Sequence, residues 1–221
     1  MMPPTATLEA IKAHQQRVEK DKISPDNLPP CPRCLVESVF FKIHAYRERR
    51  FLIIIGMLVK AAYCTLVRFG CPGCGKTFTH YPDFAIPHKH YTLPSIMGFS
   101  ERYVDSDDMT YNKSVMVEGI VPGYPQADAT LCPSTVHRWI TTVGQLPGTC
   151  RTALSFLLQE KPTLSICRDL GRLVVPQRKY KTKQRRKQLI GCRQLLVIET
   201  FFKATFKKSI FTKLATRCAF G

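Results

Sequence analysis

The pattern of hydrophobic and polar positions predicts a short helix near the N-terminus. Over residues 7–22, Thr7 is placed to cap a helix, and Leu8, Ile11 and Val18 recur roughly on one face. The remaining positions are mostly polar, so the pattern favours a solvated leader helix. Residues 24–30 follow, with the proline-rich composition of a linker.

Three later runs predict strands, because they are rich in β-branched and aromatic residues. They cover residues 36–44, 50–58 and 62–69. Beyond them, Pro82 and Pro87 interrupt any helix. Residues 91–147 have the pattern of helical pieces around a Pro/Gly loop at 122–125. A further helix is predicted over 149–161, where Pro162 ends it.

The strongest helical pattern covers residues 134–144, between Pro133–Ser134 and the natural stop at Gly144. At 100° per residue, the apolar and polar side chains fall on opposite faces. Such a helix is typical of the second helix of a helix-turn-helix, because arginine can read guanine edges and threonine can reach phosphates or thymine methyl groups. An ordinary amphipathic surface helix has the same pattern. The apolar face holds Val136, Trp139, Ile140 and Val143; the polar face holds Thr135, Arg138 and Thr142, flanked by His137 and Thr141.

Charge strengthens the nucleic-acid interpretation. The 221 residues include 33 Lys and Arg against 16 Asp and Glu, a formal net charge of +17. Residues 168–221 hold fifteen of these cations and two of the acids, so the excess lies at the C-terminal end. This asymmetry predicts a polyanionic partner, nucleic acid before membrane. Seven cations are concentrated in residues 178–187 and are expected to track phosphates as an arm, with a solvated, partly disordered tail as the alternative: Arg178, Lys179, Lys181, Lys183, Arg185, Arg186 and Lys187.

No membrane partner is expected. The longest apolar run, residues 51–59, has nine residues, whereas a spanning helix needs about 20. The N-terminus has neither the basic nor the apolar region of a signal peptide. We therefore expect a cytoplasmic protein, associated with the nucleoid in a bacterium, in which the ten cysteines are thiols or metal ligands.

Two Cys-x-x-Cys knuckles predict one structural Zn²⁺, bound by Cys31, Cys34, Cys71 and Cys74. Zinc takes four soft ligands in a tetrahedron, and each tight turn can aim two sulfurs at one ion. The strand-rich sequence between the knuckles fits a zinc ribbon, and four thiolates leave no open position for catalysis. As an alternative, a downstream histidine replaces one cysteine: His80, His88 or His90. The other cysteines are expected to be buried thiols: Cys64, Cys132, Cys150, Cys167, Cys192 and Cys218.

Residues 70–77 match the phosphate-binding pattern G-x-x-x-x-G-K-[ST]. That mechanism needs a helix to open at the Lys-Thr pair, so that its N-terminus receives the phosphates. Here two prolines follow within ten residues, and the loop contains the second knuckle. We therefore expect no nucleotide ligand.

Residues 31–145 resemble bacterial transposase-like zinc-ribbon proteins, many of them domains of unknown function. The two knuckles carry most of the resemblance, together with the sequences of residues 46–50, 68–77 and 81–91. Such proteins have a ribbon followed by a helix-turn-helix, to which 134–143 is similar. The resemblance implies a mobile-element setting, DNA binding and zinc on the four cysteines. Residues 50–63 depart from the pattern, because they are unusually long and apolar.

Catalysis is not favoured. A transposase core of the RNase H type needs three well-separated carboxylates on a large sheet, and residues 151–221 contain only Glu160, Asp169 and Glu199. The cluster of Asp105, Asp107 and Asp108 is better interpreted as a solvated loop or helix cap. No catalytic residue is therefore predicted.

These observations predict an α+β fold: a small antiparallel zinc ribbon, a helical helix-turn-helix region and a basic C-terminal tail. The expected divisions are residues 1–30, 31–91, 92–165 and 166–221. The predicted function is non-catalytic DNA binding in a mobile element, as an accessory factor, a regulator or a truncated transposase. DNA is the expected partner, and a transposase or another mobile-element protein is a second one. Two alternatives stay open: a nuclease or recombinase subunit with unplaced catalytic acids, and an RNA-binding zinc-ribbon protein.

Overall fold

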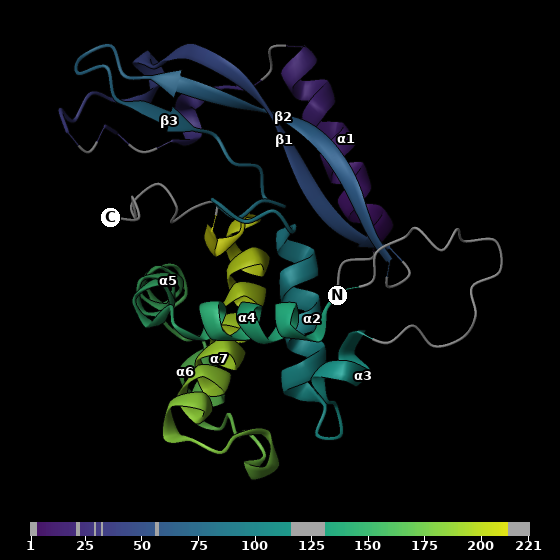
Figure 1. Ribbon diagram of the computed structural model, residues 1–221. Helices are drawn as coiled ribbons and strands as arrows, with labels where there is room; N and C mark the ends of the chain where they lie inside the picture. The colour runs from purple at the N-terminus through teal and green to yellow at the C-terminus, as the bar shows by residue number, and fades with distance from the viewer. Residues whose placement is uncertain are drawn as a thin grey trace. The chain divides into compact units, whose positions relative to one another are not determined.

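A computed structural model describes residues 4–20, 23–28, 30–31, 33–55, 58–115 and 131–211 (Figure 1). The predicted loop at 122–125 and Cys218 lie outside this part of the chain. The fold is mixed α/β and divides into two compact units. Among the described residues, the sheet unit comprises those up to Ile55, Lys60–Leu93 and Phe211. The helical unit comprises the described residues of Pro94–Ile210, together with residues 58–59.

The sheet unit is built on three strands in the order β1-β2-β3. They are β1 (Lys42–Ile55), β2 (Leu58–Gly70) and β3 (Thr77–Thr79). β2 and β3 are antiparallel, with Arg68 opposite Thr79. The strand predicted over 62–69 lies within β2. The one predicted over 50–58 is correct only up to Ile55, where β1 ends, because Leu58 already belongs to β2 and residues 56–57 lie outside the described part of the chain.

The strand predicted over residues 36–44 is wrong in its first half. Ser38–Phe40 form a 3₁₀ turn, and β1 begins at Lys42. The turn brings Phe41 into a buried cluster with Val67 and Phe69 of β2, while Val39 and Phe40 stay exposed. The start of β1 is therefore determined by the burial of Phe41. The residue composition of 36–44 does not determine it.

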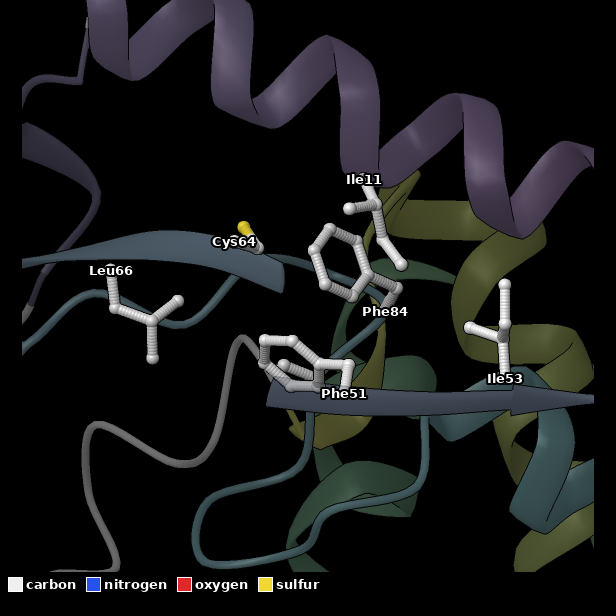
Figure 2. Packing of buried hydrophobic residues seen from close by; sticks show 7 residues of the cluster. Ile11, Phe51, Ile53, Cys64, Leu66 and Phe84 are labelled. Atoms are coloured by element: carbon white, nitrogen blue, oxygen red, sulfur yellow. The ribbon is translucent and has the colours of Figure 1, made fainter. Parts of the chain in front are cut away.

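The main core of the sheet unit is an apolar cluster on one face of the hairpin (Figure 2). Side chains two residues apart on a strand share a face, so Phe51 and Ile53 of β1 face the same way. Phe84 meets Phe51 edge-on, with ring centroids 5.4 Å apart. The cluster consists of Ile11, Phe51, Ile53, Cys64, Leu66, Phe84 and Ala85.

Helix α1 (Pro4–Glu19) packs on this hairpin. Ile11 and Val18 are buried, which confirms the predicted apolar face but contradicts the interpretation as a solvated leader. Two polar side chains complete the docking, because His14 Nε2 donates to the Thr65 carbonyl at 3.1 Å and the Thr65 N–H donates to Gln15 Oε1 at 2.9 Å. The sequence interpretation failed because His14 and Gln15 look like solvent-facing residues.

The docking of α1 is expected to weaken in acid. Burial lowers the pKa of His14, and Arg17 lowers it further, although the bond to Thr65 acts in the opposite direction. His14 Nδ1 is buried without a partner, and the His80 ring stacks against His14. In the unfolded chain, His14 therefore takes up a proton at higher pH than in the fold. Stability should be full above about pH 6.5 and fall below it, by at most about 1.4 kcal/mol per pH unit.

Urea unfolding at about pH 7.5 and about pH 5.5 checks this effect of the proton. His14→Met keeps the side-chain volume but cannot titrate, so its free energy of unfolding should depend less on pH than that of the unaltered protein. Bound metal is measured at both pH values. Equal pH dependence in the two proteins would show that His14 does not contribute.

The helical unit contains six α-helices among its described residues. Val136, Trp139, Ile140 and Val143 of α4 are buried, which confirms the predicted apolar face. Helix α5 occurs where residues 149–161 predict it. Within the described residues, no helix has the length and apolar character that crossing a bilayer requires. The helices are α2 (Leu93–Asp105), α3 (Tyr111–Val115), α4 (Pro133–Gly144), α5 (Pro147–Glu160), α6 (Ile166–Gly171) and α7 (Lys183–Phe206).

The expected basic tail is a helix over Lys183–Phe206. The Thr182 side chain caps α7 by accepting from the Arg185 N–H at 3.1 Å. Apolar side chains then recur at helical spacing and are buried: Leu189, Cys192, Leu195, Leu196, Ile198 and Phe202. The prediction of a tail is wrong because this apolar stripe anchors the basic residues at the start of α7.

Helices α4 and α7 cross at a pair of glycines. A Cβ atom on Gly144 would lie 2.0 Å from the Gln188 carbonyl oxygen, and one on Gly191 would lie 2.5 Å from the Gly144 carbonyl oxygen. Real Cβ atoms essentially never come this close. Gly144 is the last residue of α4, as predicted, but its greater role is to let the two backbones touch.

Among the described residues, the helix before α4 is α3, and residues 116–130 between them lie outside the described part of the chain. The described helices therefore do not themselves establish, before α4, the connection of about 3–4 residues that a helix-turn-helix has. Helix α4 is instead followed closely by α5, with Gln145 and Leu146 between them.

Candidate metal centre and basic surface

The two knuckles fold in the same way. In each, the N–H four residues after the first cysteine donates to that cysteine's carbonyl: Leu35 to Cys31 at 2.8 Å, and Gly75 to Cys71 at 2.9 Å. The first cysteine's own N–H then donates to the carbonyl five residues ahead, at 2.9 and 2.8 Å respectively. Leu35 and Gly75 both have a positive φ, of 59° and 71°. The matched spacing in the sequence is therefore matched in conformation.

The four knuckle sulfurs meet in one cluster. Cys31 Sγ lies 3.4 Å from Cys74 Sγ, and Cys34 Sγ lies 3.4 Å from Cys71 Sγ. All four sulfurs lie within 4.8 Å of one another, and none forms a disulfide. A tetrahedral ion with metal–sulfur bonds near 2.3 Å needs sulfurs about 3.8 Å apart. The cluster therefore fits a single metal ion, and zinc is compatible with it.

The electrostatics of the cluster favour a negative charge on Cys31 and oppose one on Cys34. Burial disfavours a charge on Cys31, but the backbone N–H groups of Arg33 and Cys34 outweigh it and lower the pKa of Cys31 to about 6. At Cys34 the Val36 N–H favours the thiolate, yet burial and the neighbouring thiols raise the pKa to about 12. Four thiolates would therefore need a cation to hold them together.

The surroundings of the sulfurs are tight and mostly apolar. Cys31 and Cys71 are buried in the cluster that contains Phe41 and Phe69. A Cβ on Gly73 would lie 3.2 Å from Cys34 Sγ and 3.0 Å from the Val36 side chain. Glycine at position 73 thus keeps space beside the sulfurs.

The paired left-handed residues give a prediction about knuckle stability. Leu35 adopts its positive φ with a side chain that is 77% exposed, so Leu35→Gly should stabilise the sheet unit by about 1 kcal/mol. Gly75 has no atom within 4 Å of a Cβ position, so Gly75→Ala should cost about 1–2 kcal/mol from backbone strain alone. Urea unfolding with saturating Zn²⁺ measures both changes.

Leu35→Ala is the control, because it removes the exposed side chain and keeps the strained backbone. It should leave the free energy of unfolding nearly unchanged. Stabilisation by Leu35→Ala as large as that by Leu35→Gly would contradict the strain argument.

Outside the cluster, the remaining cysteines and histidines only partly follow expectation. Cys64 and Cys192 are buried thiols, as predicted, and Cys150 is half-buried. Cys132 and Cys167 are exposed, contrary to prediction, because they lie at the N-terminus of α4 and on the short α6. Among the described residues, no histidine joins the four cysteines. His80, His88 and His90 lie elsewhere in the sheet unit.

The resemblance to a phosphate-binding loop has no structural counterpart. β3 begins at Thr77, where the nucleotide-binding mechanism requires a helix to start.

The polar face of α4 is open to solvent. His137, Arg138 and Thr142 are exposed, and Thr135 is half-buried. Arg138 donates to Thr135 Oγ1 at 3.3 Å, and the Thr142 hydroxyl donates to the Arg138 carbonyl at 2.9 Å. Both are contacts within the helix, so this face is available to a partner in the isolated unit.

Two cations of the basic run are engaged inside the helical unit. Lys179 donates to the carbonyls of Tyr103 and Ser106 at the end of α2, and burial lowers its pKa. Arg185 donates to the hydroxyls of Tyr111 and Thr141, the latter at 2.9 Å. The sequence does not indicate these contacts of Lys179 and Arg185, because no feature of a run of cations distinguishes side chains that bind within the fold from those exposed to solvent.

The remaining cations of the run lie outside. Arg178 forms an exposed ion pair with Asp108 at 3.0 Å. Beyond the run, Arg193 pairs at 3.1 Å with Asp105, the last residue of α2. Two members of the acidic cluster, Asp105 and Asp108, are thus paired with arginines. The other exposed cations of residues 178–187 are Lys181, Lys183, Arg186 and Lys187.

The Arg185 contacts fix the first turn of α7 beside α4. Thr141 lies on α4, and the Tyr111 ring contacts His137 on the same helix, with centroids 5.4 Å apart. Burial, and secondarily Arg185, lowers the pKa of His137. The polar face of α4 and the first turn of α7 therefore form one surface, which we call the α4/α7 surface.

Comparisons with known proteins give one match. Residues 31–139 match the model of a family described as a domain of unknown function (DUF6431). The matched segment begins at the first knuckle cysteine and ends inside α4, so it contains all four clustered sulfurs. No curated protein and no solved structure matches the chain.

Proposed function

We propose that this chain is a non-catalytic DNA-binding protein in which one structural Zn²⁺ holds the sheet unit and the α4/α7 surface contacts DNA. The single observation that carries the proposal is the α4/α7 surface itself. An exposed Arg/Thr/His helix face lies against the basic first turn of a second helix.

Zinc is supported by the chemistry of the donors. Four thiolates with an S···S spacing near the tetrahedral value are typical of structural Zn²⁺. The expected role is structural, since four sulfurs fill the coordination shell and leave no position for a reacting water.

The charge of the α4/α7 surface supports a nucleic-acid partner. Residues 131–150 and 181–188 contain six cations and no carboxylate. Cations without competing carboxylates are what phosphate contact requires. In the proposed complex Arg138 reads a base edge, and Lys183, Arg186 and Lys187 contact phosphates. Half-buried Thr135 and exposed His137 and Thr142 flank Arg138 and are its expected neighbours in the interface.

The positions of the acidic side chains support a non-catalytic role. Within the described ranges, the four cysteines are the only group of three or more His, Cys, Asp or Glu residues close enough to hold a metal. Asp105 and Asp108 pair with arginines, and buried Glu199 accepts from the Ile210 N–H and pairs with Lys203. Metal-dependent DNA cleavage by the purified protein would instead favour the nuclease alternative.

The test is a pair of titrations on duplexes, one obtained by selection from a random pool and one scrambled. Arg138→Ala should weaken binding to the selected duplex by about 10- to 100-fold, or roughly 1–3 kcal/mol, and change the scrambled one far less. Substituting Lys183, Arg186 and Lys187 with Gln should weaken both and flatten the salt dependence by about 0.9 per lost contact.

Arg151→Ala is the matched control, because Arg151 is also exposed on a helix of the same unit but lies on α5. Should Arg138→Ala weaken both duplexes equally, Arg138 is a phosphate contact and does not read bases. Should it weaken neither, the α4/α7 surface does not bind DNA. Tighter binding to single-stranded RNA than to any duplex would favour the RNA-binding alternative.

A mobile-element setting, as accessory factor, regulator or truncated transposase, is part of the proposal. Terminal inverted repeats around the coding sequence, or an adjacent transposase reading frame, would support it.

A further inference from the structure

Three arginines surround a small hollow on the sheet unit. The hollow measures about 170 Å³ and is lined by Arg47, Glu48, Arg49, Leu66, Arg68, Thr79 and Tyr81. Residues two apart on a strand share a face, so Arg47 and Arg49 continue the face of Phe51 on β1. Arg68 continues the face of Leu66 on β2. The hollow is thus the polar extension of the main apolar core.

Two of the three guanidinium groups are held in place by uncharged partners. Arg68 donates from Nε to Thr77 Oγ1 at 2.8 Å and from Nη2 to the same oxygen. Arg49 donates to the Lys89 carbonyl at 2.8 Å, and its guanidinium lies 5.2 Å from the Phe51 ring centroid and 5.5 Å from that of Tyr81. Arginines fixed in this way lose little side-chain freedom when they bind a ligand.

The three arginines carry unneutralised charge. In the described part of the chain, none of them forms an ion pair with a carboxylate. Glu48 is the one acid among the lining residues, which leaves a net charge of two positive units from 3 − 1. Three guanidinium groups close to a single carboxylate repel one another and attract an anion.

We propose that this arginine pocket binds a phosphate group, presented by a nucleic-acid backbone or free in solution. Guanidinium forks match the geometry of phosphate oxygens. The volume is below the roughly 300–1,000 Å³ of pockets that enclose small organic molecules, so a single phosphate group suits it better than a nucleotide. The backbone source rests on the function proposed above, whereas the pocket itself does not.

The experiment compares Arg47→Gln with Arg50→Gln in the zinc-loaded full chain. Both residues are exposed on β1 and both changes remove one charge, but Arg50 does not line the pocket. One arm measures duplex affinity against salt concentration. The other measures thermal stability in inorganic phosphate against chloride at equal ionic strength. Arg47→Glu and Arg50→Glu repeat both arms with a larger change in charge.

The proposal is supported if the Arg47 variants lose salt-dependent duplex affinity or stabilisation by phosphate and the Arg50 variants keep both. The salt slope should fall by about 0.9 for Arg47→Gln if the backbone is the source. The phosphate-specific rise in melting temperature should disappear in Arg47→Gln if free phosphate is the source. Equal behaviour of the Arg47 and Arg50 variants in both arms would overturn the proposal. Failure of the unaltered protein to bind any nucleic acid would instead overturn the proposed function, and the phosphate arm would still decide the pocket.

Discussion

Cys31→Ser and Cys74→Ser are each expected to abolish metal binding and to unfold the sheet unit. The cysteines come from knuckles on either side of the β1–β2 hairpin, and the buried sulfurs of Cys31 and Cys71 sit in an apolar cluster. Without the ion, the charge on the remaining thiolates opposes their close approach. Structural zinc contributes about 10–16 kcal/mol in small modules, which is as large as the whole stability of most domains.

Metal analysis, near-UV circular dichroism and amide NMR spectra measure the effect. Cys167→Ser is the control, because Cys167 is exposed on α6 and lies outside the cluster; it should retain one ion per chain. Signals of the helical unit should persist in the Cys31 and Cys74 variants. Full zinc retention in a variant lacking both cysteines would refute the centre.

Gly144→Ala and Gly191→Ala are expected to have the largest effect on the helical unit. A methyl group at Gly144 would lie 2.0 Å from the Gln188 carbonyl oxygen, and a backbone atom cannot rotate away as a side chain can. Helices α4 and α7 would have to separate, which would loosen the packing of both. The expected cost is at least about 3 kcal/mol.

Gly148→Ala provides the control within the same unit. Gly148 lies in α5 with no atom within 4 Å of a Cβ position, so alanine should be neutral there or stabilise by up to about 1 kcal/mol. Chemical denaturation followed by helical circular dichroism gives all three values. A cost below about 1 kcal/mol for Gly144→Ala would mean that the crossing adapts easily.

The sequence pattern predicts correctly those features that depend on residues close together in the chain. The face of α4 followed from helical spacing, and the cysteine cluster followed from two equal knuckles. The match of Leu35 with Gly75 was missed, since nothing about a leucine signals a left-handed backbone. The register of α1 against the hairpin was missed as well, because its decisive contacts join His14 and Gln15 to a backbone fifty residues away.

The basic residues show the limit of reading charge from sequence. Lys179 and Arg185 look the same as Lys181 and Arg186 in the run, yet the first two bind carbonyls and hydroxyls inside the helical unit. Arg47, Arg49 and Arg68 were not grouped at all. They come together through strand pairing, and their spacing in the sequence has no motif.

The contacts at the two sides of the hairpin have a consequence for solubility. A strand edge with free N–H and carbonyl groups can pair with an edge of another copy and start aggregation. Here Thr65 of β2 is bound on both groups by Gln15 and His14, and Leu52 of β1 is bound by the backbones of His90 and Thr92. Helix α1 and the segment after β3 therefore cover the two edges of the hairpin and prevent pairing with another copy. A chain shortened to begin at the first knuckle would expose β2 to intermolecular strand addition, even with its metal in place.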